Sequence, residues 1–451
     1  MKLLAIFTLS LSTYFINAQE KTDRKSQPNI LFICVDDLRP ELPSFGKDYI
    51  KAPHMEKLFS EGRLFKRHYV QSPTCGISRL SLLAGIYPDE QGLTNGSITH
   101  HDHINNPTFP THFKNNGYYT AAVGKVSHYP GNLSGAQWAD PNKPEIPNAW
   151  DSSPQSNGEW KHAEGLMHGY ANGKARVKKV TPVYEDEDAR YPDDAIMDGF
   201  KIQLQQVSQQ QKPWLLAVGL LRPHLPFACH SKHLEPYKDV RLPSIPANKK
   251  PANGEFWHSS GEFMNYKQSA DPRKDQAYAD NVRKHYAACV TSSDEHIGGI
   301  LQQLKDAKLD DNTIVVLWSD HGWHLGEQQI WGKHSPYAVA LHSPLCIKLP
   351  KTSRAGIASD QVVETVDIYP TLCELANIPL PDHLDGNSLA EILANPNSKS
   401  DGTAIAYWKK NKSIITQHEH KIYTWKGQKQ GELTQHYNLR KDPHEAINLV
   451  K

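Results

Sequence analysis

The sequence predicts an α/β fold in which helices cover both faces of a large parallel sheet, followed by a smaller C-terminal subdomain with a short antiparallel sheet. Continuous apolar runs alternate with helical patterns through most of the chain, as in sheets that are buried on both faces. From Thr403 onward the pattern changes to short, closely spaced strand-like runs. The 451 residues suffice for one large and one smaller domain, because single cores stop growing beyond about 250–300 residues.

Apolar runs and amphipathic patterns locate the expected elements. The buried strands span 29–35, 118–123, 214–221 and 313–318, and two helices span 195–209 and 285–304. The C-terminal strands span 403–408, 413–417, 420–425 and 432–439. Segments 130–190 and 240–275 have little periodicity and are expected to be long loops that wall a site. We therefore expect an N-terminal domain over 19–375 and a C-terminal subdomain over 376–451.

Residues 1–18 are predicted to be a secretory signal peptide. Lys2 precedes an apolar run over 3–16, and a small-residue junction ends at Ala18. The run is short for a membrane span, and no second long apolar stretch follows it. We expect an exported protein, periplasmic or secreted, without a membrane span.

The charge balance and the cysteine pattern narrow the function classes. Lys plus Arg total 50 against 49 Asp plus Glu, a formal net charge of +1, so no basic excess indicates nucleic-acid binding. Any anion specificity must come from the local placement of charges. The six cysteines are spread singly without a Cys-x-x-Cys pair, which indicates neither a zinc site of that type nor a disulfide scaffold.

The segment 72–85 carries the most informative motif of the chain. Cys75 comes just before a short helical pattern that ends at Gly85, and Arg79 follows Cys75 by one helical turn. Backbone N–H groups and the dipole at a helix N-terminus favour an oxyanion, and arginine adds a planar donor fork. The pair therefore indicates a reactive side chain beside an anion site.

Three carboxylates directly follow two of the predicted strands. Asp36 and Asp37 come after 29–35, and Asp320 comes after 313–318. The carboxyl ends of strands in open α/β sheets are where ligands bind, so these groups are expected to converge. Clustered buried carboxylates require a cation, and oxygen donors favour Ca²⁺ or Mg²⁺. His321 offers an additional nitrogen ligand.

Cationic and proton-carrying residues follow the other strands and one later loop. They are Lys125 and His128, Arg222 and His224, and Lys333. Cleavage of an anionic ester needs cations around its nonbridging oxygens and a proton donor at the leaving oxygen. The cluster at 100–103, His-His-Asp-His, is instead interpreted as a polar loop.

The ordered set of motifs resembles the type I sulfatases of the alkaline phosphatase-like superfamily, and most of all their iduronate-2-sulfatase branch. The resemblance rests on NILFICVDDLR from Asn29, CGISR from Cys75, GKVSH from Gly124, RPHLPF from Arg222, SDHGWHLGE from Ser319 and WGK from Trp331. The closing segment YNLRKDPHEAINL from Tyr437 also fits, so the resemblance covers nearly the whole mature chain. It implies an α/β/α sandwich fold with a large mixed, mostly parallel sheet.

The resemblance also implies a metal centre and a modified nucleophile. Cys75 would be oxidised to formylglycine by a maturation enzyme, and the hydrated aldehyde would attack sulfur. One Ca²⁺, in preference to Mg²⁺, would be held by Asp36, Asp37, Asp320, His321 and the modified Cys75. In the implied roles, Arg79 and Lys125 steady the nucleophile, His128 assists sulfate expulsion, Lys333 holds the sulfate and His224 serves the leaving oxygen.

The branch similarity implies a sulfated, uronic-acid-containing oligo- or polysaccharide as substrate, such as a glycosaminoglycan or ulvan. Arg222, Trp323 and His324 are expected to contact the sugar, because tryptophan can stack on a sugar face and arginine can pair with a carboxylate.

Two alternatives stay open. The first is a phosphatase or phosphodiesterase of the same superfamily, although such enzymes often use two zinc ions and a Thr or Ser nucleophile. The second is a catalytically silent glycan-binding protein. It depends on Ile77, which stands where the family usually has proline or alanine and would reduce the conversion of Cys75.

Overall fold

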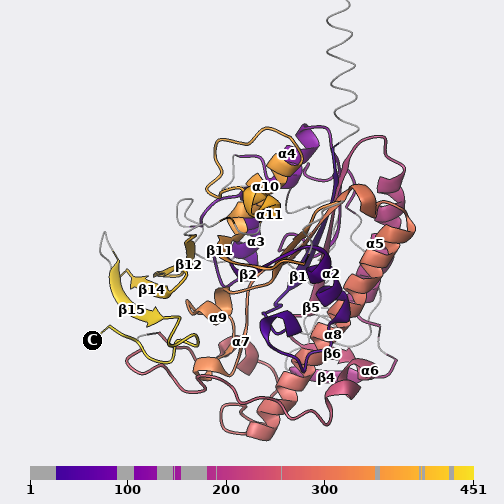
Figure 1. The fold of residues 1–451 in the computed structure, drawn as a ribbon. Coiled ribbons are helices and arrows are strands. Elements are labelled where there is room, and N and C mark those ends of the chain that lie inside the picture. The colour runs from indigo at the N-terminus through magenta and orange to yellow at the C-terminus, as the bar shows by residue number, and fades with distance from the viewer. Residues whose placement is uncertain are drawn as a thin grey trace, which may run out of the picture.

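A seven-stranded sheet runs through the centre of the molecule (Figure 1). The computed structural model describes residues 27–88, 106–128, 146, 148–153, 180–188, 190–254, 256–350, 356–395, 398, 402–425 and 431–450. The strand order is β11-β2-β10-β7-β1-β5-β3. Strand β10 is antiparallel to both of its neighbours, and all the other pairs are parallel. The sheet is therefore mixed and mostly parallel, as predicted.

The four strands predicted from apolar runs form one half of this sheet as direct neighbours. They are β1 (Asn29–Asp36), β3 (Tyr119–Gly124), β5 (Trp214–Pro223) and β7 (Thr313–Ser319). All are parallel, and Ile33 of β1 lies beside Leu317 of β7 and Val218 of β5. Their carboxyl ends therefore lie along one edge. The other half contains β2 (Arg63–Tyr69), β10 (Leu345–Lys348) and β11 (Ser359–Glu364).

Two hydrophobic cores lie on opposite faces of the sheet, because side chains alternate along a strand. Leu31, Ile33 and Val35 of β1 belong to one core, and Ile30 and Phe32 belong to the other. The first core packs on α2 (Pro53–Glu61), α5 (Pro192–Ser208) and α8 (Gln276–Asp306). The second packs on α3 (Cys75–Ala84), α4 (Phe109–Asn115), α10 (Ile368–Leu375) and α11 (Ala390–Ala394).

Both helices predicted from periodicity are present. The pattern at 195–209 corresponds to α5, and the pattern at 285–304 is the second part of α8. Helix α8 begins earlier than predicted because the Asp275 side chain caps it, accepting a hydrogen bond from the N–H of Tyr278 at 2.9 Å. A side chain that satisfies an otherwise unpaired N–H group stabilises a helix start.

A smaller antiparallel sheet follows, as predicted, at the C-terminal end of the chain. It consists of β12 (Ala404–Trp408), β13 (Asn411–Ile415), β14 (Glu419–Thr424) and β15 (Glu432–Asn438) in that order. It joins the large sheet through a separate apolar cluster, in which Ala406 and Ile415 pack with Tyr69 and Val362. The small sheet is thus attached near β2 and β11.

Short elements connect these layers. The strands are β4 (Val183–Asp186) with β6 (Phe227–His230), and β8 (His324–Leu325) with β9 (Trp331–Gly332). The short α-helices are α6 (Ser231–Leu234), α7 (Gly261–Met264) and α9 (Ala338–Leu341). The 3₁₀ turns are η1 (Pro43–Phe45), η6 (Glu235–Tyr237), η7 (Asp310–Asn312), η8 (Glu327–Gln329) and η9 (Thr365–Asp367).

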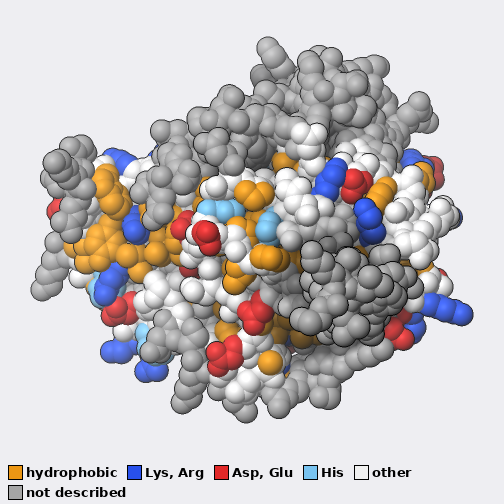
Figure 2. Space-filling view, turned by 90° about the horizontal axis from the view of Figure 1, so that it is seen from above, with side chains coloured by type: hydrophobic (Ala, Val, Ile, Leu, Met, Phe, Trp, Pro, Cys, Tyr) orange, Lys and Arg blue, Asp and Glu red, His pale blue; other side chains and the backbone are white. Residues whose placement is uncertain are grey.

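Several sequence predictions fall outside the described residues or stay predictions. The signal peptide at 1–18 and the polar cluster at 100–103 lie outside the described residues. The boundary between 375 and 376 stays a prediction, and Leu372, Ile378 and Leu393 from both sides of it share one core. Among the described helices, none has the length and apolarity needed to cross a membrane. On the face shown in Figure 2, basic and acidic side chains are interspersed.

Strands β3 and β5 approach unusually closely at two glycines just before the site. A Cβ on Gly219 would lie 2.1 Å from the carbonyl group of Lys125, and Gly124 has a φ of +74° that favours glycine. The N–H of Lys125 donates to the carbonyl of Gly219 at 2.9 Å. This contact brings the end of β3 to the site.

Gly219→Ala is expected to destabilise the fold by about 1–3 kcal/mol or more, because backbone atoms rather than a flexible side chain oppose the added methyl. The thermal unfolding midpoint measures the effect. Gly261→Ala is the matched control, since an added Cβ there meets nothing within 4 Å. Equal midpoints for the two variants would contradict the close approach of β3 and β5.

Candidate active site

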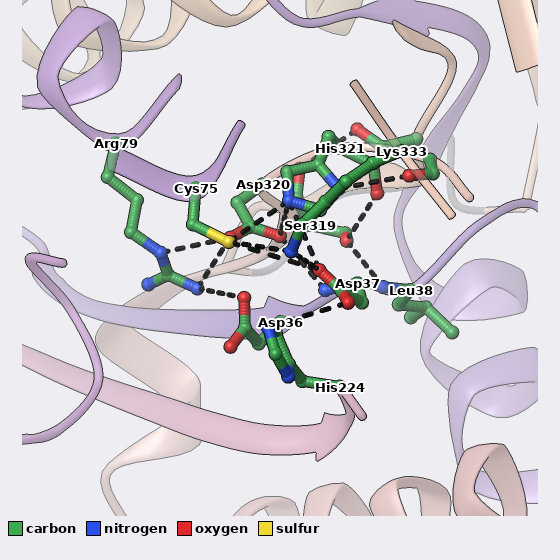
Figure 3. Close-up of polar contacts among 12 residues, drawn as sticks. Asp36, Asp37, Leu38, Cys75, Arg79, His224, Ser319, Asp320, His321 and Lys333 are labelled. Carbon is green, nitrogen blue, oxygen red and sulfur yellow. Dashed lines mark hydrogen bonds and ion pairs between the residues drawn. The ribbon is translucent and has the colours of Figure 1, made fainter. Parts of the chain in front are cut away.

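Polar side chains from several strand ends converge at one edge of the sheet (Figure 3). Asp36 ends β1 and Asp37 follows it, Asp320 and His321 follow β7, and His224 follows β5. Apart from His224, which is 4% exposed, these side chains have no exposed surface, so solvent does not screen their charges. The strand ends therefore converge at this edge of the sheet, as predicted.

Cys75 is the first residue of α3 and points into this cluster. The first backbone hydrogen bond of the helix runs from the N–H of Ser78 to the carbonyl of Thr74 at 2.9 Å, so the preceding N–H groups have no partner within the helix. Gly85 ends the helix in a left-handed conformation with φ of +70°. The predicted start and end of the helix are both confirmed.

Arg79 links two strand ends to α3. Its Nε donates to Asp320 Oδ2 at 3.0 Å, and its Nη2 lies 3.4 Å from Asp36 Oδ1. Its Nη1 donates to the backbone carbonyls of Lys125 and Val126, the latter at 3.0 Å. The Lys125 ammonium contacts the second oxygen of Asp36. Arg79 and Lys125 thus neutralise carboxylates that carry no exposed surface.

Lys333 reaches the cluster from the loop that follows β9. Its Nζ donates to Asp37 Oδ1 at 2.8 Å and lies 3.1 Å from Cys75 Sγ. Glu262 Oε1 lies 3.6 Å from the same ammonium. Because of these negative partners, the pKa of Lys333 is raised well above its usual range although burial acts to lower it. Lys333 is therefore a cation held beside the Cys75 side chain.

Hydrogen bonds assign the tautomers of two histidines. His321 Nδ1–H donates to the carbonyl of Gly322 at 2.9 Å, and His224 Nδ1–H donates to that of Leu225 at 2.7 Å. In the neutral rings, Nε2 therefore carries a lone pair. His321 Nε2 lies 3.2 Å from Cys75 Sγ, and His224 Nε2 lies 3.7 Å from Asp37 Oδ2.

Burial keeps the histidines of the site neutral. The pKa of His224 is lowered to about 3 by burial and by the Lys333 ammonium. Burial and Lys333 also hold the pKa of His321 well below its usual range, and burial and Lys125 do the same for His128. Neutral imidazole is the form that binds metals and accepts protons.

The carboxyl groups divide according to their partners. Burial raises the pKa of Asp37 well above its usual range and that of Asp320 to about 6, with the Asp36 carboxylate adding to both shifts. Burial also acts to raise the pKa of Asp36, yet Lys125, His224 and Arg79 hold it well below its usual range. Lys333 and Arg79 act to lower the pKa values of Asp37 and Asp320 but do not outweigh burial, so a further positive charge would stabilise both carboxylates.

The residues present fit a hard divalent cation. Ligand atoms of Asp36, Cys75, Asp320 and His321 lie within 4.8 Å of one another. The buried Asp37 Oδ2 has no hydrogen-bond partner among the described residues, which leaves an acceptor directed into the cluster. Carboxylate oxygens and an imidazole nitrogen are donors that divalent metal ions take in proteins.

The Cys75 side chain itself is a protonated thiol. Burial and the Asp36 carboxylate raise the pKa of Cys75 well above its usual range, although Lys125 and Lys333 act to lower it. Cysteines that act as nucleophiles through their sulfur have lowered pKa values. The surroundings therefore do not activate the sulfur of Cys75 as a thiolate.

His128 lies against the start of α3. A Cβ built on Gly76 would be 3.4 Å from the His128 ring, so the glycine allows the imidazole to approach the residue after Cys75. The structure thus brings His128 to the same region as Arg79 and Lys125.

The three residues predicted to contact a sugar are buried. Arg222, 2% exposed, donates from Nε to the carbonyl of Ala228 at 2.8 Å. Trp323 and His324 are fully buried, and His324 Nε2 lies 2.6 Å from Ser335 Oγ. Arg79 and Lys125 of the site are buried to the same degree, and the Trp323 ring lies 5.4 Å from Lys333 Nζ, so the sugar contacts stay predictions.

Two residues at the site were missed by the sequence analysis. Glu262, on α7, faces both Lys333 and His224, the latter at 3.8 Å. Ser319 Oγ accepts a hydrogen bond from the N–H of Leu38 at 3.1 Å and so joins the ends of β7 and β1. The expectation that 240–275 walls a site was the only signal for Glu262, and no motif marks that residue.

Comparison with known proteins matches this geometry. The Sulfatase family model matches residues 28–378, and a model described as N-sulphoglucosamine sulphohydrolase, C-terminal, matches residues 326–451. Iduronate 2-sulfatase from Mus musculus is 29% identical over 415 residues, which cover 83% of this chain and 74% of that protein. An ulvan-active sulfatase from Formosa agariphila is 27% identical over 410 residues, covering 88% of this chain and 71% of the relative.

A solved structure of a protein from Bacteroides fragilis, described as a sulfatase, superposes with a TM-score of 0.72 at 20% identity and covers 94% of this chain and 91% of its own. At this level of sequence identity, the superposition is evidence for the fold alone. It agrees with the alkaline phosphatase-like arrangement of sheet and helices. Because the family model spans most of the sequence, including every strand of the large sheet, this chain belongs to the sulfatase family, whose members hydrolyse sulfuric esters.

Proposed function

We propose that this protein is an exported sulfatase that removes sulfate from a sulfated, uronic-acid-containing oligo- or polysaccharide, using formylglycine made from Cys75 and one Ca²⁺ ion. The observation that carries the proposal is the position of Cys75. It begins α3, faces Lys333 at 3.1 Å, and lies within 4.8 Å of ligand atoms from Asp36, Asp320 and His321.

The surroundings of Cys75 do not favour its own sulfur as the nucleophile, which is why the proposal assigns that role to formylglycine. Its thiol is protonated and buried, so it is a poor nucleophile in its own right. Once hydrated, formylglycine supplies a hydroxyl group that can attack sulfur. Arg79 and Lys125, both fully buried, provide fixed positive charge beside this position.

Hydrogen-bond donors for the sulfate oxygens lie beside Cys75. Lys333 and the unpaired N–H groups at the start of α3 can hold the nonbridging oxygens, where negative charge must be stabilised. Fixed donors in a site without solvent stabilise such charge more strongly than donors in water. Asp36, Asp37, Asp320 and His321 would hold Ca²⁺, which supplies additional positive charge for the sulfate oxygens.

In the proposed reaction, His224 serves the leaving oxygen after it takes up a proton. With Nδ1–H engaged by Leu225, its Nε2 is a proton acceptor in the neutral ring. Donation to the sugar oxygen therefore requires that the negative charge of the bound ester raises the pKa of His224 from about 3. The Asp36 and Glu262 carboxylates act in the same direction, and Glu262 lies 3.8 Å from Nε2.

The names of two relatives support the proposed substrate class. One is an iduronate 2-sulfatase and another is an ulvan-active sulfatase, and both cover more than four fifths of this chain. A phosphate ester is the competing substrate, since it differs by a second negative charge near neutral pH. Faster release of phosphate than of sulfate from matched esters would favour the phosphatase alternative.

Cys75→Ala is expected to reduce sulfate release from a sulfated uronate oligosaccharide to the level without enzyme, because the nucleophile is removed. The protein is produced with a maturation enzyme, and peptide mass analysis follows the replacement of one sulfur and two hydrogens by one oxygen at Cys75. Cys373→Ala, a change at another buried cysteine, is the control and should retain activity. No sulfate release despite confirmed formylglycine would falsify the sulfatase proposal.

Ile77→Pro is expected to increase the fraction of Cys75 that is converted. The family resemblance places proline here, and residue 77 is the third residue of α3, where no intrahelical hydrogen bond from its N–H is lost. Mass analysis of the peptide measures the converted fraction. Unconverted Cys75 in the wild type, together with glycan binding, would instead support the silent glycan-binding alternative.

Removal of Ca²⁺ with a chelator is expected to abolish activity and to lower the thermal midpoint, with both restored by added Ca²⁺. Free Ca²⁺ at 100 times its dissociation constant would stabilise the fold by about 2.7 kcal/mol. Asp320→Asn should lose this response, whereas Asp294→Asn should keep it, because the Asp294 carboxylate accepts hydrogen bonds from His54 and Met55 away from the cluster. A response unchanged by Asp320→Asn excludes this metal site.

A further inference from the structure

A cavity of about 250 Å³ lies beside Lys333. The residues that form its outer wall have no role in the proposed reaction. Because Lys333 also contacts Cys75 Sγ at 3.1 Å, a ligand in the cavity would reach the reacting centre. Pockets for drug-sized ligands have volumes of about 300–1,000 Å³, so this cavity suits a single sugar ring. The described part of its outer wall includes Trp408 and Lys409 of the small sheet.

Trp408 attaches the small sheet to the segment that carries Lys333. The rings of Trp408 and His334 stack with centroids 5.2 Å apart and an angle of 23° between their planes. His334 follows Lys333 directly, and its N–H donates to the carbonyl of Pro73 at 3.3 Å, close to the start of α3. The turn between β12 and β13, which begins with Lys409, is thereby held at the mouth of the site.

Two residues that line this cavity have left-handed backbone conformations. Lys409 and His334 have φ values of +53° and +60°, a region that residues other than glycine seldom occupy. Such conformations persist only where the surrounding structure determines them.

The described part of the cavity lining carries one carboxylate, Glu262, and two ammonium groups, and Glu262 lies 3.6 Å from Lys333 and 3.5 Å from His334. Lys333 is engaged by Asp37 at 2.8 Å, whereas Lys409 has no carboxylate within ion-pair distance among the described residues. The Lys409 Nζ lies 5.3 Å from the centre of the Trp408 ring, and this cation–π contact orients the ammonium group. Burial first, and the charges of Lys333 and Lys409 in addition, lower the pKa of His334 to about 4. His334 is therefore neutral, and Lys409 supplies positive charge.

We propose that Lys409 binds the carboxylate of the sugar ring whose sulfate is cleaved, so that the small sheet selects uronic-acid substrates. This inference rests on the proposed sulfatase function and deepens it by assigning the carboxylate to Lys409. The stack of Trp408 on His334 sets the position of the ammonium group relative to Lys333. The cation at one end of the cavity binds the carboxylate while the cation at the other end binds the sulfate.

Binding of a disaccharide with 2-O-sulfated iduronate to the Cys75→Ala protein tests the proposal without turnover. The carboxyl-reduced disaccharide is the second ligand, and calorimetry gives both dissociation constants. Lys409→Ala is expected to weaken binding of the carboxylate ligand about tenfold, as for one charge-assisted hydrogen bond, and to leave the reduced ligand within about twofold.

Lys410→Ala is the matched control, because Lys410 is the exposed next residue of the same turn, is absent from the cavity lining and carries the same charge. Equal losses in the two variants, an equal loss for both ligands, or no binding of either ligand would overturn the assignment. Sulfate release by the converted protein is measured separately. Release that Lys409→Ala leaves unchanged overturns the carboxylate site alone, whereas no release by the wild type overturns the proposed function.

Discussion

The site depends on opposite charges that are held together without solvent. Asp36 is fully buried, and its two carboxylate oxygens contact Arg79 and Lys125. Removing one partner of a buried ion pair costs about 3–5 kcal/mol, because the other charge stays uncompensated. Arg79 also donates to backbone carbonyls at the end of β3, so the same interaction ties α3 to the sheet. The position of Cys75, one turn before Arg79, follows from this network.

The parallel half of the sheet makes such a concentration of charge possible. Four adjacent strands end at one edge, and each delivers its following residues to the same place. Gly124 and Gly219 bring two of the strands close enough for Lys125 to reach Asp36. The start of α3 adds N–H groups from the side. The residues that cluster here are costly to bury alone and become stable only as a set.

The small C-terminal sheet contributes residues to the wall of the cavity beside Lys333. The strand ends of the large sheet supply the reacting centre. No strand residue of the large sheet is among the described residues that line the cavity beside Lys333. The turn between β12 and β13 forms part of that wall and is fixed by the stack of Trp408 on His334. A strained turn is tolerated there because the packing on both sides determines its conformation.

The sequence by itself determined the four buried strands, the start and end of α3, and the residues that follow each strand. These features are local, since an apolar run, a cap and a spacing of one helical turn act over a few neighbouring residues. Only the tertiary structure decided that Arg222, Trp323 and His324 are packed inside, and that Glu262 and Lys409 border the cavity. Strands β2, β10 and β11 also took their places through pairing with distant segments. Exposure and proximity between distant segments arise from packing of the whole chain, which no short stretch of sequence contains.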